Sequence, residues 1–180
     1  FWAAMHLFLV RHRTASATSE DFRQAVRAAT GENLAQFWSE WMYRPGYPRL
    51  SVRAAYDSTT RSLSLTLRQT QRDSAVTADS AWPPTPEVYH ATITVLVHTA
   101  AGDVRRRVAL DTRAQSLVLD SLPDAPEYVV FDEGNTLLKA LDFPEPTSWL
   151  AAQLAGDPDL WDRAWVIDEL SHRTNDSTAG

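Results

Sequence analysis

The 180-residue sequence contains no cysteine. Disulfides, thiol nucleophiles and thiolate metal sites are therefore excluded. The absence leaves the localisation unknown, because a chain without cysteine is tolerated in oxidising and in reducing compartments alike.

Long apolar runs are also lacking. The longest, Phe1–Val10, is shorter than the about 20 residues that a membrane-spanning helix needs. It has neither the basic flank nor the small-residue cleavage site of a signal peptide. We predict no membrane segment in this chain and interpret the run as a core helix of a larger helical domain. A first residue that is phenylalanine instead of methionine fits a fragment.

Basic residues are too few for a nucleic-acid-binding face. The formal net charge is −6, and Arg105–Arg107 is the longest basic run. Successive side chains of a strand point to opposite faces, so only two of these arginines would share one. We predict a solvated strand edge there and no nucleic-acid partner.

The pattern that a zinc peptidase requires is missing as well. That chemistry uses two histidines four residues apart on one helix, with a carboxylate between them. No two of the five histidines have this spacing: His6, His12, His90, His98 and His172. There is no G-x-S-x-G motif and no glycine-rich phosphate loop. We therefore expect no catalytic, cofactor-binding or metal-binding residue in this chain.

Two adjacent carboxylate pairs have a simpler interpretation than acid–base catalysis. Asp132-Glu133 precedes a glycine and is typical of a turn, and Asp168-Glu169 is typical of a solvated helix face.

The first 45 or so residues have a helical pattern. Thr18 and Asp21 form a possible capping box for a helix that Gly31 would end in a left-handed conformation. Its apolar stripe comprises Phe22, Ala25, Val26 and Ala29. Asn33 would cap a second helix, whose broad apolar face comprises Leu34, Phe37, Trp38 and Trp41.

From residue 49 to about 132 the period changes to two. Leu63, Leu65 and Leu67 alternate with small polar residues, and further alternating sets lie between turn signals. Five to seven short strands at this spacing predict an antiparallel sandwich. The stretch Arg72–Pro86 is predicted to be a long connection.

The helical period returns near Pro146. Gly156 would end one helix and Asp157 would cap the next, which predicts a helical hairpin like the start of a HEAT-like solenoid. We expect the polar tail Ser171–Gly180 to be frayed or disordered.

Several of these segments resemble the aminopeptidase N-like zinc metallopeptidases. The run GENLAQFWSEWMYRPGYP, Gly31–Pro48, is similar to the junction between the catalytic domain and a β-sandwich in that family. The run FDEGNTLLK, Phe131–Lys139, resembles the last sandwich strand and its exit in bacterial members. The opening of the C-terminal helical domain is resembled by Trp149, Gln153-Leu154, Asp157 and Arg163-Ala164.

The resemblance implies an α+β multidomain fragment: a short α-helical segment, an antiparallel β-sandwich of about seven strands, and a C-terminal α-helical hairpin. Residues 1–47 would hold the last helices of the catalytic domain. Residues 48–143 would form the sandwich, and 144–180 the start of a HEAT-like helical domain and a tail.

The family implies a zinc-dependent enzyme that removes N-terminal residues from peptides. Its zinc ligands lie upstream of this junction, so zinc is expected in the parent enzyme and not in this chain. The implied partners are the remainder of the parent protein and, for the parent, a peptide substrate. The chain would then space the catalytic and C-terminal domains, with Phe37, Trp38 and Trp41 docked on the sandwich.

Two alternatives remain open. One is a scaffold or interaction protein of the same fold without zinc chemistry. The other is an independent β-sandwich binding module, which three flanking apolar helices make less fitting.

Overall fold

The computed structural model describes residues 1–72 and 83–176. This part of the chain has an α+β fold with two sheets of four and three strands. It divides into two compact units. One is Phe1–Gly46, and the other comprises Tyr47–Arg72 and the described chain from Glu87 onward. The described residues include no helix with the length and apolar character to cross a membrane.

The first unit is helical. Its elements are α1 (Trp2–Arg11), α2 (Ser19–Thr30), α3 (Ala35–Phe37) and the π-helical turn η1 (Trp38–Met42). The ring of Phe22 links them, because it meets Phe8 edge-on at a centroid distance of 5.3 Å and lies 6.1 Å from Trp38. An aromatic cluster is therefore the core of this small unit.

The predicted ends of α2 are confirmed. Thr18 Oγ1 accepts a hydrogen bond from the Asp21 amide, and Asp21 Oδ2 accepts one from the Thr18 amide, which completes the capping box. Gly31 ends the helix at a φ of 77°. Of the predicted stripe, Ala25 and Val26 are buried, whereas Ala29 is exposed.

The next helix differs from the prediction. Asn33 Oδ1 accepts from the Ala35 amide as expected of a cap, but after one α-turn the backbone widens into η1, where the Tyr43 amide donates to the Trp38 carbonyl. A wider turn changes the angular positions of the side chains. Trp38 is consequently buried at 5 % exposure while Phe37 remains 46 % exposed.

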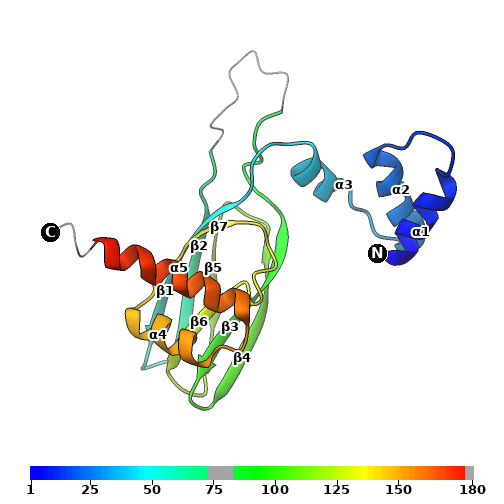
Figure 1. Ribbon diagram of the computed structural model, residues 1–180. Coiled ribbons are helices and arrows are strands. Elements are labelled where there is room, and N and C mark those ends of the chain that lie inside the picture. The colour runs from blue at the N-terminus through cyan, green and yellow to red at the C-terminus, as the bar shows by residue number, and fades with distance from the viewer. Residues whose placement is uncertain (73–82, 177–180) are drawn as a thin grey trace. The chain divides into compact units, whose positions relative to one another are not determined.

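The second unit begins with a β-sandwich (Figure 1). One sheet has the order β5-β2-β1-β7 and the other β4-β3-β6. The strands are β1 (Arg49–Asp57), β2 (Ser62–Gln69), β3 (Ala91–Thr99), β4 (Gly102–Leu110), β5 (Ala114–Leu119), β6 (Pro126–Phe131) and β7 (Ala140–Asp142). All pairs are antiparallel except β1 with the short β7.

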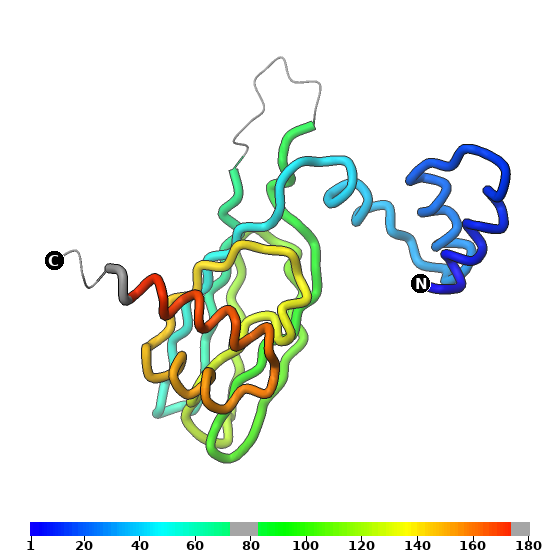
Figure 2. The backbone as a smooth tube through the Cα atoms, viewed as in Figure 1, coloured from blue at the N-terminus to red at the C-terminus, as the bar shows by residue number. Residues whose placement is uncertain are grey.

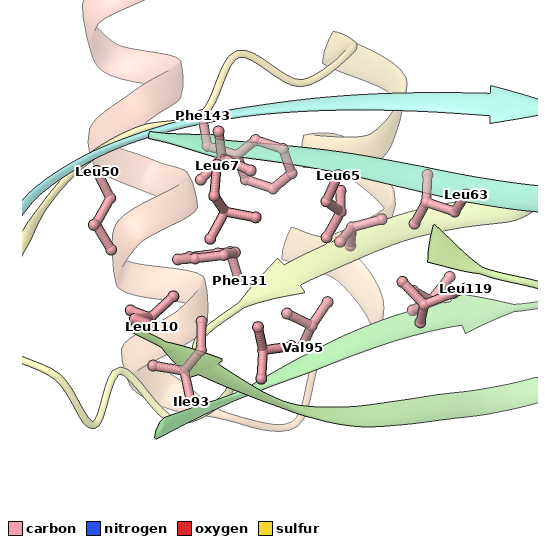
Figure 3. Close-up of a cluster of buried hydrophobic side chains, with 14 of the residues drawn as sticks. Leu50, Leu63, Leu65, Leu67, Ile93, Val95, Leu110, Leu119, Phe131 and Phe143 are labelled. Carbon is pink, nitrogen blue, oxygen red and sulfur yellow. The ribbon is translucent and has the colours of Figure 1, made fainter. Parts of the chain in front are cut away.

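The alternating leucines of β2 point into the core, as the sequence predicts. Leu63 and Leu65 are fully enclosed, and Figure 3 shows Leu65 pointing toward the side of the core where Val95 of the other sheet lies. Arg105–Arg107 lie on β4, which is an edge strand, and all three arginines are exposed. This confirms the solvated strand edge.

The predicted connection Arg72–Pro86 lies largely outside the described residues, but two glutamines of the sandwich hold the chain near its ends. Gln69 Oε1 accepts from the Tyr89 amide at 2.9 Å, and Gln69 Nε2 donates to the Tyr89 carbonyl at 2.9 Å. Gln71 Nε2 donates to the Glu87 carbonyl.

The helical hairpin α4 (Thr147–Gly156) and α5 (Leu160–Asp176) packs against the sandwich. Trp149 and Ala152 of α4 cover the face of the three-stranded sheet that points away from the sandwich core, and they contact Leu96, Tyr128 and Val130. Parts of β3 and β6 are therefore covered on both faces. In α5, the ring of Trp165 stacks on Phe143 at 6.4 Å.

Two details of the hairpin correct the sequence interpretation. Asp159, not Asp157, caps α5, because its Oδ1 accepts from the amides of Trp161 and Asp162. Pro158 therefore lies before the helix. The helix also continues to Asp176, so much of the expected frayed tail is helical.

Candidate functional site

The five histidines belong to different parts of the chain. His6 and His12 belong to α1 and the residue after it, His90 precedes β3, His98 lies on β3 and His172 on α5. Among the described residues, no three histidine or carboxylate side chains are placed to hold a metal ion. The described part of the chain therefore contains no group of side chains arranged as zinc ligands.

His98 has a local structural role. Its Nδ1 lies 2.6 Å from Asp103 Oδ1, and its ring stacks on Tyr128 at 4.5 Å. The hydrogen bond from His98 holds the pKa of Asp103 below its usual range. Burial raises the pKa of Tyr128 to about 12, so this phenol stays protonated.

The most elaborate polar cluster joins the sandwich to the helical hairpin. We call it the polar joint; it lies within the second unit and comprises Asp132, Gly134, Lys139, Gln153, Asp157 and Asp162. Figure 2 shows the connection from β6 to β7, which carries the first three, beside the start of α5.

Asp132 is the centre of the turn after β6. Its backbone has a φ of 70°, a conformation that aspartate tolerates better than most residues. Its carboxylate is fully buried and accepts from Lys139 Nζ at 2.6 Å, Thr136 Oγ1 at 2.6 Å and the Leu137 amide at 2.9 Å. A buried charge persists only when it is paired and hydrogen-bonded, and this one is both.

Asp162 joins the turn to α5. Its Oδ2 accepts a hydrogen bond from the Gly134 amide at 2.9 Å, and Oδ1 lies 3.1 Å from the same nitrogen. Burial raises the pKa of Asp162 to about 6, and the negative charges of Asp157, Asp159 and Glu133 act in the same direction, against the Gly134 bond. The first turn of the helix is therefore attached to the sandwich by a charge-assisted hydrogen bond.

A further buried carboxyl lies on the segment between β7 and α4. Glu145 is 4 % exposed, and neither carboxylate oxygen has a hydrogen-bond partner among the described residues. Burial raises the pKa of Glu145 to about 8, and the positive charge of Arg173 offsets part of this rise. This group is best accommodated in its neutral form.

The sequence interpretation of the carboxylate pairs is confirmed in part by these positions. Asp132-Glu133 forms a turn and Asp168 lies on an exposed helix face, as predicted. The ion pair of Asp132 was missed, because the residue was assigned only to the turn. One signal was available: Lys139 is the single lysine among 17 basic residues.

The polar joint positions the helical hairpin on the sandwich. Its lysine is neutralised by Asp132, and its carboxylates accept hydrogen bonds from backbone amides of the protein itself. The arrangement is that of a structural connection between two layers.

Comparison with known proteins points to aminopeptidases. No family model matches the chain. It is 24 % identical over 177 residues to the puromycin-sensitive aminopeptidase of Caenorhabditis elegans, a match that covers 97 % of this chain and 18 % of that protein.

A solved structure gives a similar result. The fold resembles Legionella pneumophila aminopeptidase A, crystallised in complex with aspartic acid, with a TM-score of 0.71 and 17 % identity over 98 % of this chain and 19 % of that one. The likeness supports an aminopeptidase-like fold. The chain spans about a fifth of the length of each of these proteins.

Proposed function

We propose that this chain is a non-catalytic segment of a zinc-dependent aminopeptidase of the aminopeptidase N-like family. In this proposal residues 1–47 are the last helices of the catalytic domain, 48–143 the sandwich, and 144–180 the start of a C-terminal helical domain. The segment holds the two outer domains at a fixed spacing. The parent enzyme binds the zinc and the peptide substrate.

The observation that carries the proposal is the rigid attachment of α5 to the sandwich. Asp162 binds the turn after β6 through the Gly134 amide, and Trp165 stacks on Phe143, itself 2 % exposed in the sandwich core. A hydrogen bond and a stacked ring pair on successive turns fix the direction of the helix. The likeness to two aminopeptidases along nearly the whole chain supports the same assignment.

Exposed apolar side chains indicate where further domains would pack. On α5, Leu160, Trp161 and Ile167 are 71 %, 66 % and 57 % exposed. On and beside α1, four apolar residues are each more than half exposed: Phe1, Trp2, Leu9 and Val10. Apolar surface gathered on one element marks an interaction site, and a helical domain on either side would bury it.

A scaffold protein without zinc chemistry would have the same fold. Zinc content and hydrolytic activity therefore have to distinguish it from the enzyme. The test is zinc analysis of the intact protein together with hydrolysis of amino-acid p-nitroanilides. We expect about one zinc per chain and release of p-nitroaniline. A folded intact protein with neither property would overturn the enzymatic assignment and favour the scaffold.

The spacing role is tested separately by Trp165→Ala in the intact protein. Loss of the ring detaches α5 from Phe143, so we expect kcat/KM to fall several-fold while the zinc content stays constant. The matched control is Arg163→Ala, a neighbouring exposed position on the same helix. Equal activity in both variants would contradict the spacing role.

A further inference from the structure

A small pocket lies where the turn after β6 meets both helices of the hairpin. Its volume is about 20 Å³, and its lining includes Lys139 from the turn, Gln153 from α4, and Asp162 and Trp165 from α5. A cavity of this size admits one water molecule, which is stable there only if it has two to four polar partners.

Gln153 supplies an acceptor in need of a donor. The residue is 1 % exposed, and its Nε2 donates to Asp157 Oδ2 at 3.3 Å. Its Oε1 has no hydrogen-bond partner among the described residues. A buried acceptor left without a donor costs about 1–3 kcal/mol, so such groups in folded proteins are normally satisfied.

Lys139 and Asp162 supply the other two partners. An ammonium has three donors, and Lys139 Nζ uses one toward Asp132 and one toward Asn135 Oδ1 at 2.8 Å. The carboxylate of Asp162 shares a single N–H between its two oxygens and therefore has lone pairs left. The three side chains thus offer one donor and two acceptors around the same space.

We infer that this pocket is a binding site for one ordered water molecule, which accepts from Lys139 Nζ and donates to Gln153 Oε1 and Asp162. A water has two donors and can accept, so its hydrogen-bonding capacity matches this set. The water connects the turn, α4 and α5. No direct hydrogen bond links Gln153 Oε1 to the turn or to α5 among the described residues. The water links the α4 member of the polar joint, Gln153, to the members on the turn and on α5.

The test is a crystal structure of the unchanged protein at a resolution that resolves ordered water. We expect one peak within about 3.2 Å of Gln153 Oε1, Lys139 Nζ and the Asp162 carboxylate. A pocket without density, or one filled by a rearranged side chain, would overturn the inference. Crystals soaked in rubidium chloride distinguish water from a monovalent cation, because an anomalous peak in the pocket would also overturn it.

The variant Gln153→Met tests the role of the amide oxygen. The two side chains are similar in length, but methionine removes the orphan acceptor, so we expect the peak to be lost. Gln115→Met on β5 is the matched control and should keep the peak. An undiminished peak in Gln153→Met would contradict the assignment; if that variant does not fold, the map of the unchanged protein decides.

Discussion

The ammonium of Lys139 lies 2.6 Å from Oδ2 of Asp132, and the two side chains are only 5 % and 0 % exposed. The pair closes the turn that follows β6 and is the enclosed centre of the polar joint. Because Lys139 is also the single lysine of the chain, its environment can be measured without interference from other lysines.

We predict that Lys139 is protected from amine-reactive reagents in the folded protein. The reagent needs access to a nitrogen that is enclosed and donates to Asp132 and Asn135. Treatment with an N-hydroxysuccinimide ester followed by mass spectrometry of the peptide that carries Lys139 should give no label in the folded protein and a label after unfolding in urea. Rapid labelling of Lys139 in the native protein would show that the ion pair is open to solvent.

The substitution Lys139→Met should be strongly destabilising. It leaves the Asp132 carboxylate buried without a counter-ion, which typically costs about 3–5 kcal/mol. Urea unfolding monitored by tryptophan fluorescence measures the loss. Asp132→Asn in the same background removes the uncompensated charge and tolerates the left-handed backbone, so the double variant should regain part of the lost stability. Equal stability of the single and double variants would argue against a charge effect.

The helix boundaries show how far local sequence signals extend. The capping box at Thr18 and the glycine at residue 31 act within a few residues of chain, and the structure confirms both. The inward leucines of β2 are set by the two-residue period of a strand, and their burial follows the prediction. Signals of this kind need no knowledge of distant contacts.

The polar joint required information that local patterns do not contain. Asp132 and Lys139 are seven residues apart across a turn, and Asp162 comes from a helix 28 residues beyond Gly134. Their meeting depends on how α5 crosses the sandwich. The cap at Asp159 was missed for a related reason, because Asp157 and Asp159 both precede the helix and sequence alone does not rank them.

Stability should depend on pH through Glu145. Its pKa is raised from 4.5 to about 8 by burial, so folding takes up a proton between these values and stability falls as pH rises from about 4.5 to 8. The full effect corresponds to at most about 5 kcal/mol above pH 8, at about 1.4 kcal/mol per pKa unit. The charges that face it are Arg173 and Glu169 of α5.

Glu145→Gln removes this titration. We expect the variant to match the unchanged protein near pH 4.5 and to be more stable by a few kcal/mol at pH 9, in urea unfolding at both values. The pH dependence of stability that Asp162 contributes below about pH 6 remains in both proteins. Glu127→Gln, on an exposed position of β6, is the control. Parallel pH profiles for Glu145→Gln and the unchanged protein would refute the prediction.

The last prediction concerns the first unit. The sequence predicts a broad apolar face on the helix that follows Asn33, and in the structure Trp38 is the buried aromatic residue of that face. Its ring lies 6.1 Å from Phe22 and 5.6 Å from Phe37, and the residue is 5 % exposed. Trp38→Ala removes the buried ring and should cost about 3–5 kcal/mol in this unit. Trp2→Ala, at a residue that is 79 % exposed, should cost far less in this chain.

Hydrogen exchange resolved by peptide is the suitable measurement, because it reports α1 and α2 separately from the sandwich. Trp38→Ala should speed exchange throughout Phe1–Gly46 and leave the strands protected. The docking of Phe37 and Trp41 on the sandwich stays a prediction, and the same experiment addresses it. If the docking holds, Trp41→Ala should also speed exchange in β1. If exchange in β1 is unchanged, these rings serve the helical unit alone.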